Sequence, residues 1–166
     1  MARGSRFAEP SCGIVALRIR QAQETDYDAL ARIWAQGWLL TDPAAPKPPD
    51  DLLDQLRSRI SREMRSGEWT LFAAEDDGRV AGMIAIKRAD NHLDQIFVAD
   101  DRRSQGVGKA MLDFVKAEMP HGFWLRTHAL NTDGHRFYAR EGMIHTRTEP
   151  HPRFPENIVR IYEWKP

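Results

Sequence analysis

The chain has 166 residues, of which 42% are hydrophobic and 29% charged, the balance of a globular domain long enough to bury a core. Lys plus Arg and Asp plus Glu both number 24, so the formal net charge is zero and no overall basic field attracts nucleic acid. The single cysteine, Cys12, excludes an intramolecular disulfide and a cysteine-based zinc site, and the histidines lack metal-ligand spacing. We therefore expect neither a metal nor a nucleic-acid partner.

The same features predict a cytoplasmic protein. One cysteine is typical of a reducing compartment, and no stretch approaches the ~20 apolar residues that span a bilayer, so we expect no membrane partner. The first dozen residues carry Arg3 and Arg6 without an apolar core, unlike a secretion signal. Ser, Gly and Pro there predict a mobile lead-in over residues 1–12, followed by one domain over residues 13–166.

The N-terminal part of the chain predicts one strand and two helices. Residues 14–19 are β-branched or aliphatic and predict the strand. Apolar residues at helical spacing predict a helix over 26–38, with Thr25 and Asp28 at the spacing of a capping box. A proline-rich loop covers residues 41–50. The second helix is predicted from a shared apolar face formed by Leu52, Leu53, Leu56, Ile60 and Met64.

The remainder predicts a meander of strands followed by alternating helices and strands. The meander comprises Trp69–Ala74, a tight turn at 75–78, Val80–Lys87 and His92–Ala99. The later elements are a helix from Val107 to Pro120, a strand at 123–127, a helix at 131–141, and strands at 144–148 and 158–164. The order βααβββαβαββ predicts an α/β fold (an α+β mixed sheet) covered by helices.

A glycine-rich loop, Arg103–Gly108, lies between a predicted strand and a predicted helix. A helix N-terminus exposes unpaired N–H groups and a partial positive charge, which suit a phosphate, and glycine lets the ligand approach the backbone. Arg102 and Lys109 add positive charge nearby. Arg103 stands where a P-loop needs its first glycine, and Met111 where a dinucleotide fingerprint needs a small residue. The alternative is a glycine-rich helix entry without a ligand.

Two segments resemble the signatures of the GNAT acetyltransferase superfamily. Residues 93–98 and 103–112 resemble its motif A, an R/Q-x-x-G-x-G/A loop that follows a strand. Asn131 with residues 136–143 resembles its second signature, N-x-x-A-x-x-F-Y-x-x-x-G-F. Both occur in the family's order, which is more specific than either alone. The chain departs from the pattern at His135-Arg136, Met143 and Asp100-Asp101.

The resemblance implies a GNAT-type fold whose central strands splay to admit acyl-CoA, and transfer of an acetyl group from acetyl-CoA to a primary amine by direct attack. Backbone amides of the loop would hold the pyrophosphate, and the backbone at Phe97 and Val98 would pair with the pantetheine arm and polarise the thioester carbonyl. The implied cofactor-binding set is Phe97, Val98, Arg103, Ser104, Gln105, Gly106, Val107, Gly108, Lys109, Ala110, Asn131 and Tyr138.

Acetyl transfer needs an unprotonated amine and a proton for the departing thiolate. Tyr138 matches the family tyrosine credited with that proton; its phenol, pKa ~10, is protonated at neutral pH, and core packing is the alternative. Alternation predicts one strand face shared by His92, Asp94, Ile96 and Val98. His92 and Asp94 are therefore the candidate bases. The alternatives are that His92 is a surface histidine, that Asp94 is a structural carboxylate, or that a water chain takes the proton.

The residues that bind the acceptor are harder to predict from the sequence. Trp34 and Trp38 are candidate walls of the substrate pocket, with core packing of the first helix as the alternative. Asp94 is a candidate substrate contact, and Arg160 is a candidate for holding a substrate carboxylate, against a simple surface charge. We expect a small-molecule amine acceptor; the alternatives are a protein or peptide (N-terminal or lysine) acetyltransferase and a non-catalytic acyl-CoA sensor. Tyr138 favours catalysis, and dimers are frequent in the family, so a homodimer stays open.

Overall fold

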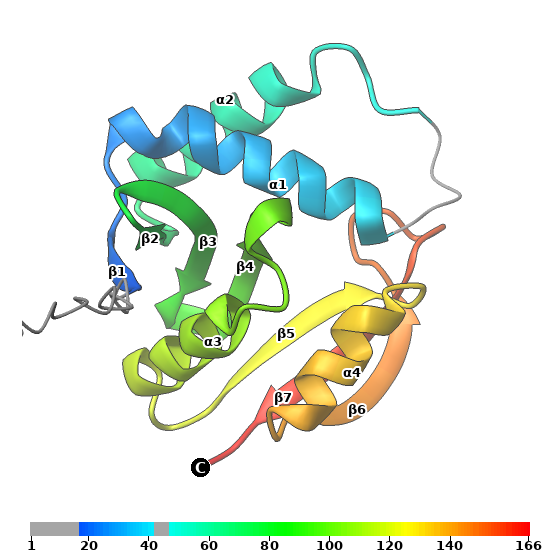
Figure 1. The fold of residues 1–166 in the computed structure, drawn as a ribbon. Helices are drawn as coiled ribbons and strands as arrows, with labels where there is room; N and C mark the ends of the chain where they lie inside the picture. The colour runs from blue at the N-terminus through cyan, green and yellow to red at the C-terminus, as the bar shows by residue number, and fades with distance from the viewer. Residues whose placement is uncertain (1–16, 42–46) are drawn as a thin grey trace, which may run out of the picture.

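The computed structural model describes residues 17–41 and 47–166, in which seven strands form one mixed sheet (Figure 1). The predicted lead-in over 1–12, residues 14–16 of the first predicted strand, and residues 42–46 of the proline-rich loop lie outside the described residues. No helix within the described ranges is long and apolar enough to cross a membrane.

The element order confirms the predicted βααβββαβαββ. The strands are β1 (Arg18–Gln21), β2 (Thr70–Asp76), β3 (Arg79–Lys87), β4 (His92–Val98), β5 (Phe123–His128), β6 (Ile144–Pro150) and β7 (Ile158–Trp164). The helices are α1 (Tyr27–Thr41), α2 (Leu52–Ser66), α3 (Val107–Glu118) and α4 (Thr132–Arg140). Short 3-10 helices lie at Glu24–Asp26, Arg88–Asp90 and Asp100–Arg102.

The entry into α1 differs from the prediction. Thr25 and Asp28 do not form the capping box, because a 3-10 turn at Glu24–Asp26 precedes the helix. The Asp26 carboxylate instead accepts a hydrogen bond from the backbone N–H of Gln23 at 2.8 Å, and the Arg20 guanidinium pairs with it at 2.8 Å. The acidic cap is thus held by β1, which ties the first strand to the first helix.

Alternation along the strands places helices on both faces of the sheet (Figure 1). In β2, Leu71 and Ala73 are buried under α1 and α2, whereas Phe72 and Ala74 are buried with α3 and α4. Burying each large apolar side chain contributes about 1.5–3 kcal/mol, so the two cores fix the layers around the sheet. The hairpin between β2 and β3 turns at Asp77 and Gly78, whose φ angles of 50° and 71° fit a tight two-residue connection.

The sheet order is β1-β2-β3-β4-β5-β7-β6. The central strands β4 and β5 are parallel and pair only at His92 and Trp124; the backbone N–H of Trp124 also donates to the Asn91 carbonyl at 2.9 Å. Beyond that point the strands part, which confirms the predicted splay. The divergence leaves one edge of β4 facing a gap in the middle of the sheet.

A bulge in β4 overturns the predicted shared face. Asp94 has no partner on β3, although both of its neighbours in sequence do, so the alternation shifts by one residue there. Ile96 and Val98 consequently pack into the core beneath α3. Asp94 faces the α1 side, where it contacts Trp69 and His92. His92 and Asp94 therefore share a face, but Ile96 and Val98 do not lie on it.

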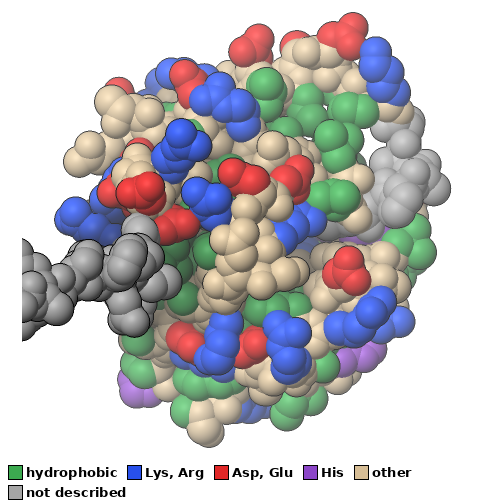
Figure 2. Space-filling model, in the orientation of Figure 1, with side chains coloured by type: hydrophobic (Ala, Val, Ile, Leu, Met, Phe, Trp, Pro, Cys, Tyr) green, Lys and Arg blue, Asp and Glu red, His purple; other side chains and the backbone are tan. Residues whose placement is uncertain are grey.

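Figure 2 shows one side of the molecule, with the side chains of Lys and Arg interspersed among those of Asp and Glu. Ion pairs between charged side chains are frequent in the described part of the chain; Arg102 and Asp76, for example, approach to 2.9 Å. This face therefore carries no continuous basic surface, in keeping with the zero net charge of the chain.

Candidate active site

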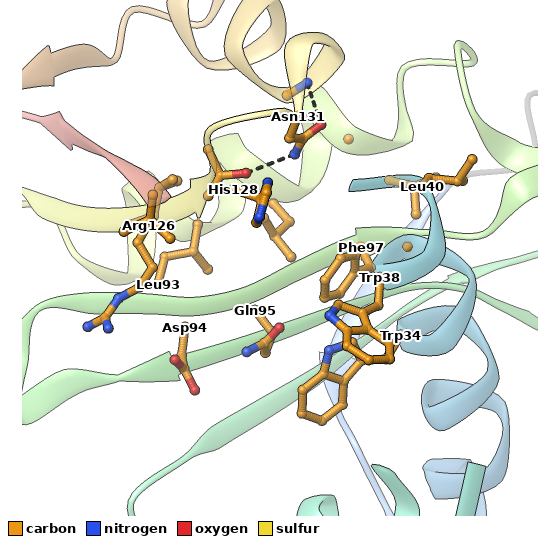
Figure 3. A pocket seen from close by; sticks show the side chains of 18 of the residues that line it. Trp34, Trp38, Leu40, Leu93, Asp94, Gln95, Phe97, Arg126, His128 and Asn131 are labelled. Atoms are coloured by element: carbon orange, nitrogen blue, oxygen red, sulfur yellow. Dashed lines mark hydrogen bonds between the residues drawn. The ribbon is translucent and has the colours of Figure 1, made fainter. Parts of the chain in front are cut away.

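A cleft of about 1760 Å³ runs from the loop before α3, through the gap between β4 and β5, to the α1 and α2 side of the sheet. Figure 3 shows the part of the cleft between β4, β5 and α1. The predicted site residues that line it are Trp34, Trp38, His92, Asp94, Phe97, Val98, Arg103, Ser104, Gly106, Gly108, Lys109, Asn131 and Tyr138. Those that do not line it are Gln105, Val107, Ala110 and Arg160.

The loop before α3 forms a cradle of backbone amides. Ser104 and Gly106 adopt left-handed φ angles of 59° and 84°, and Gly106 caps the helix. The first amides of an α-helix have no carbonyl partner within it, which leaves those of Gly106 to Lys109 open. The Ala110 N–H donates to the Gly106 carbonyl at 3.0 Å, so its predicted role as a phosphate donor is corrected. A Cβ built on Gly106 meets nothing within 4 Å.

The side chains around this cradle are already engaged. Arg103 pairs with Asp100 at 3.1 Å, and Lys109 pairs with Asp113 at 2.6 Å. The Gln105 side chain donates to the backbone of the preceding turn at 2.9 Å, and Val107 is buried in the core. Exposed ion pairs of this kind contribute little, so the helix N-terminus is the main fixed positive feature of the cradle.

Tyr138 lies on α4 beneath the gap and is 7% exposed. Burial raises the pKa of its phenol, and the neighbouring Tyr162 raises it further, so the hydroxyl stays protonated at neutral pH. The hydroxyl forms no hydrogen bond with any other described residue. A protonated phenol at the cleft with no protein partner is available as a proton donor.

Asn131 acts first as the cap of α4. Its side-chain oxygen accepts from the Gly134 N–H at 3.0 Å, and its amide donates to the Thr127 hydroxyl at 2.8 Å (Figure 3). Asn131 thereby fixes the start of α4 against β5. This fastening holds α4, and with it Tyr138, at the side of the gap.

A buried polar pair behind Tyr138 has no counterpart in the predicted site. The Tyr162 hydroxyl lies 3.1 Å from His135 Nδ1, and His135 Nε2 lies 3.0 Å from the Ala129 carbonyl. The carbonyl fixes the proton on Nε2, so Nδ1 accepts from the tyrosine. Because the Tyr162 ring packs 5.5 Å from that of Tyr138, this pair supports the candidate acid from behind.

His92 is a poor general base in this environment. Its ring stacks on Trp124 with centroids 3.8 Å apart, and burial lowers its pKa to about 4 despite the charge of Asp94. The Nδ1 atom lies 3.7 Å from the Asp94 carboxylate, beyond hydrogen-bond distance. A base with a pKa so far below neutrality has little driving force to take a proton from an amine.

Burial of neutral His92 predicts a pH-dependent stability. Its pKa falls from 6.5 to about 4 on folding, so the unfolded chain binds the proton more tightly. The stabilisation is complete above pH 6.5 and is lost as the pH falls from 6.5 through 4. We expect the thermal unfolding midpoint of His92→Gln to fall less steeply over this range. Buried His135 and partly buried His151, whose pKa values desolvation also lowers, account for the residual slope. Equal slopes in both proteins would contradict the assignment.

Asp94 is the remaining candidate base. One carboxylate oxygen accepts from the Trp69 indole N–H at 2.8 Å, which fixes the side chain on the α1 side of β4. The carboxyl group is 15% exposed and lines the cleft. Asp94 is thus oriented by one partner while still facing the cavity (Figure 3).

The structure places the residues predicted to bind the acceptor in different surroundings. Trp34 is 4% exposed and packs against Trp69 in the core, whereas Trp38 is 47% exposed at the cleft wall. Arg160 is not brought to the cleft: alternation along β7 gives that face to Val159. Sequence reasoning missed further lining residues, among them Arg59, Trp124, Arg126, His151 and Arg153. Only the period of two along β5 hinted that Trp124 and Arg126 share a face.

The cleft joins an anion cradle at a helix start, a gap between two splayed parallel strands and a buried phenol. This combination suits an extended ligand that carries phosphate at one end. The chain belongs to the Acetyltransferase (GNAT) family, whose model matches residues 27–143. The protein is accordingly an acyl-CoA-dependent N-acetyltransferase.

Three similar proteins illustrate the family. The chain is 25% identical over 125 residues to peptidyl-lysine N-acetyltransferase YiaC of Escherichia coli (strain K12), covering 75% of this chain and 81% of that protein. Its fold matches PaiA N-acetyltransferase from Thermoplasma acidophilum, solved in complex with coenzyme A, at a TM-score of 0.66 and 18% identity over 91% and 99% of the two chains. A chimera of spermidine N-acetyltransferase SpeG from Vibrio cholerae and hSSAT matches at 0.66 and 14% over 90% and 95%.

Proposed function

We propose that the enzyme acetylates the primary amine of a small molecule, using acetyl-CoA and direct attack. The observation that carries this proposal is the continuity of the cleft, which joins the amide cradle to a partly buried chamber beside Asp94 through the gap at Tyr138. A donor and an acceptor that approach from opposite ends would meet in that gap. Holding both reactants together makes a bimolecular reaction effectively unimolecular.

The donor end is built from backbone. The open amides of Gly106 to Lys109 fit a pyrophosphate, and no side chain at Gly106 obstructs its approach. The free edge of β4 at Phe97 and Val98 offers main-chain groups to the extended arm of the cosubstrate and to its carbonyl oxygen. When bound, acetyl-CoA supplies the acetyl group as an activated thioester.

The reacting groups of the chain have separate tasks. A C–N bond forms as the C–S bond breaks, and we assign the Tyr138 hydroxyl, which burial keeps protonated, to give its proton to the departing sulfur. We assign Asp94, which the Trp69 indole holds, to orient the amine and to pass its proton towards water. His92, buried and neutral, shapes the wall beside Asp94 rather than taking the proton.

A peptide acceptor is the second candidate, because the similar E. coli protein is named a peptidyl-lysine N-acetyltransferase. The charge of the acceptor end favours the small molecule. Arg59, Arg126 and Arg153 line this end, and they favour an acceptor that brings a negative charge, which the side chain of a peptide lysine lacks.

Two measurements test the proposal. Calorimetry is expected to show acetyl-CoA binding at micromolar strength or tighter, and the absence of binding would remove the donor assignment. A screen of amines, amino acids and lysine peptides, followed by release of free CoA, is expected to give turnover with a small amine. Turnover with peptides alone would replace the small-molecule acceptor with a protein, and binding without any turnover would leave only the role of an acyl-CoA sensor.

A further inference from the structure

Arginine side chains gather at the acceptor end of the cleft. Arg59 and Arg126 both line it. Within the described part of the chain, their Nε atoms are buried without a hydrogen bond, as is Nε2 of the neutral His92. The terminal guanidinium nitrogens of the two arginines are not among these buried atoms, so a ligand in the cleft would meet them.

Arg126 is the clearest case. It forms no ion pair and no hydrogen bond with any other described residue, although it is half-buried on β5. Its guanidinium carbon lies 5.0 Å from the centre of the Trp124 ring, which holds the side chain across the cleft towards Asp94 (Figure 3). A half-buried guanidinium that is not paired with a carboxylate of the protein favours an anionic ligand.

Arg59 approaches the same chamber from α2. Its guanidinium carbon lies 5.0 Å from the Trp34 ring centre and 5.7 Å from that of Trp69, and its Nε reaches the Glu63 carboxylate only at 3.7 Å. That distance is an ion pair without a hydrogen bond. The two aromatic rings hold the guanidinium of Arg59, a residue that lines the cleft.

Arg153, in the loop between β6 and β7, is the third arginine that lines this end of the cleft. Burial lowers the pKa of His151, and the positive charges of Arg126, Arg153 and Arg59 lower it further, while Asp94 raises it. His151 therefore lies within electrostatic reach of all three guanidiniums. Arg59 is paired with Glu63, but Arg126 has no ion pair with Asp51, Asp54 or Asp90, which line this end.

We propose that the acceptor is a small amine that also carries a carboxylate, held by Arg126 with Arg59, so that its amine lies beside Asp94 at the mouth of the gap. The planar fork of a guanidinium binds a carboxylate through two parallel hydrogen bonds, which the terminal nitrogens of these arginines can donate. A polyamine brings only positive charge to the three arginines and is disfavoured. The inference rests on the proposed acetyltransferase function and narrows its substrate class.

Matched pairs of amines test the carboxylate directly: lysine against cadaverine, tyrosine against tyramine, and arginine against agmatine. With saturating acetyl-CoA, the acid-bearing member of at least one pair is expected to have a kcat/KM at least about tenfold higher, the size of one charge-assisted contact. Arg126→Gln is expected to remove this preference by lowering kcat/KM for the acid alone. Arg126→Lys should restore part of it, and Arg79→Gln, an exposed arginine on the distant hairpin, should change nothing.

The outcomes separate the substrate class from the function. Equal or faster turnover of the amines that lack a carboxylate, or of a lysine peptide, would overturn the inference while leaving the acetyltransferase intact. If no amine is acetylated, tryptophan fluorescence of the CoA-saturated protein still decides, because Trp34, Trp69 and Trp124 adjoin the arginines. Saturable quenching by the amino acids that Arg126→Gln abolishes supports the site; its absence overturns it.

Discussion

Gly106→Asp is expected to weaken acetyl-CoA binding at least about hundredfold. A Cβ there meets nothing within 4 Å, so the aspartate side chain has room, while the left-handed φ of 84° adds backbone strain that the control below shares. Its carboxylate would then stand against the pyrophosphate in the amide cradle. Two like charges about 4 Å apart repel by about 4 kcal/mol at an effective dielectric of 20, which exceeds a hundredfold loss even after partial relaxation. Calorimetry with acetyl-CoA measures the change.

Gly78→Asp is the matched control for this variant. Gly78 also has a left-handed φ, 71°, and also has nothing within 4 Å of a built Cβ, but it lies in the hairpin between β2 and β3. The control therefore adds the same charge and the same backbone constraint away from the cleft. Unchanged affinity in Gly106→Asp, or an equal loss in the control, would refute the assignment of the cradle.

Tyr138→Phe is expected to lower kcat about 100-fold or more, the usual range for removing a positioned general acid. Affinity for acetyl-CoA should stay within about twofold, because the cradle is formed by backbone of another element. The hydroxyl has no partner among the described residues, so its loss should not destabilise the protein. Burial raises the pKa of Tyr138, and kcat should therefore not decline through its ionisation up to about pH 10.

Tyr162→Phe gives the opposite pattern and serves as the control. Its hydroxyl is paired with His135 at 3.1 Å in the core behind Tyr138. Removing it leaves a buried imidazole nitrogen unpaired, at an expected cost of about 1–3 kcal/mol in the free energy of unfolding. The ring remains, so kcat should change little. Denaturant unfolding and steady-state rates measure both variants; full activity in Tyr138→Phe would end its role as acid.

The two ends of the cleft recognise their ligands by different means. The donor end presents main-chain amides and a strand edge, which depend on backbone shape and tolerate many side chains. The acceptor end presents the side chains of Arg59, Arg126 and Asp94, which we propose select the acceptor. Substitutions at this end should therefore change acceptor preference without changing the affinity for acetyl-CoA.

The order of elements could be read from the sequence because periodicity is a local property. Apolar residues recur every two or every three to four positions along single elements, and the two short signatures placed the cradle between β4 and α3. Capping was less predictable: Asp26, rather than the pair Thr25 and Asp28, capped the start of α1, because its partner Arg20 comes from β1.

The sequence by itself determined the fold class, the family and the Arg103–Gly108 loop, since each depends on neighbouring residues. Only the tertiary structure decided which way the site residues face. The bulge at Asp94 separated it from Ile96 and Val98, and pairing with β3, a non-local event, produced that bulge. Arg59 and Arg126 likewise lie in the same cleft only because α2 and β5 both line it. The packing of segments distant in sequence sets this arrangement, and no local pattern encodes it.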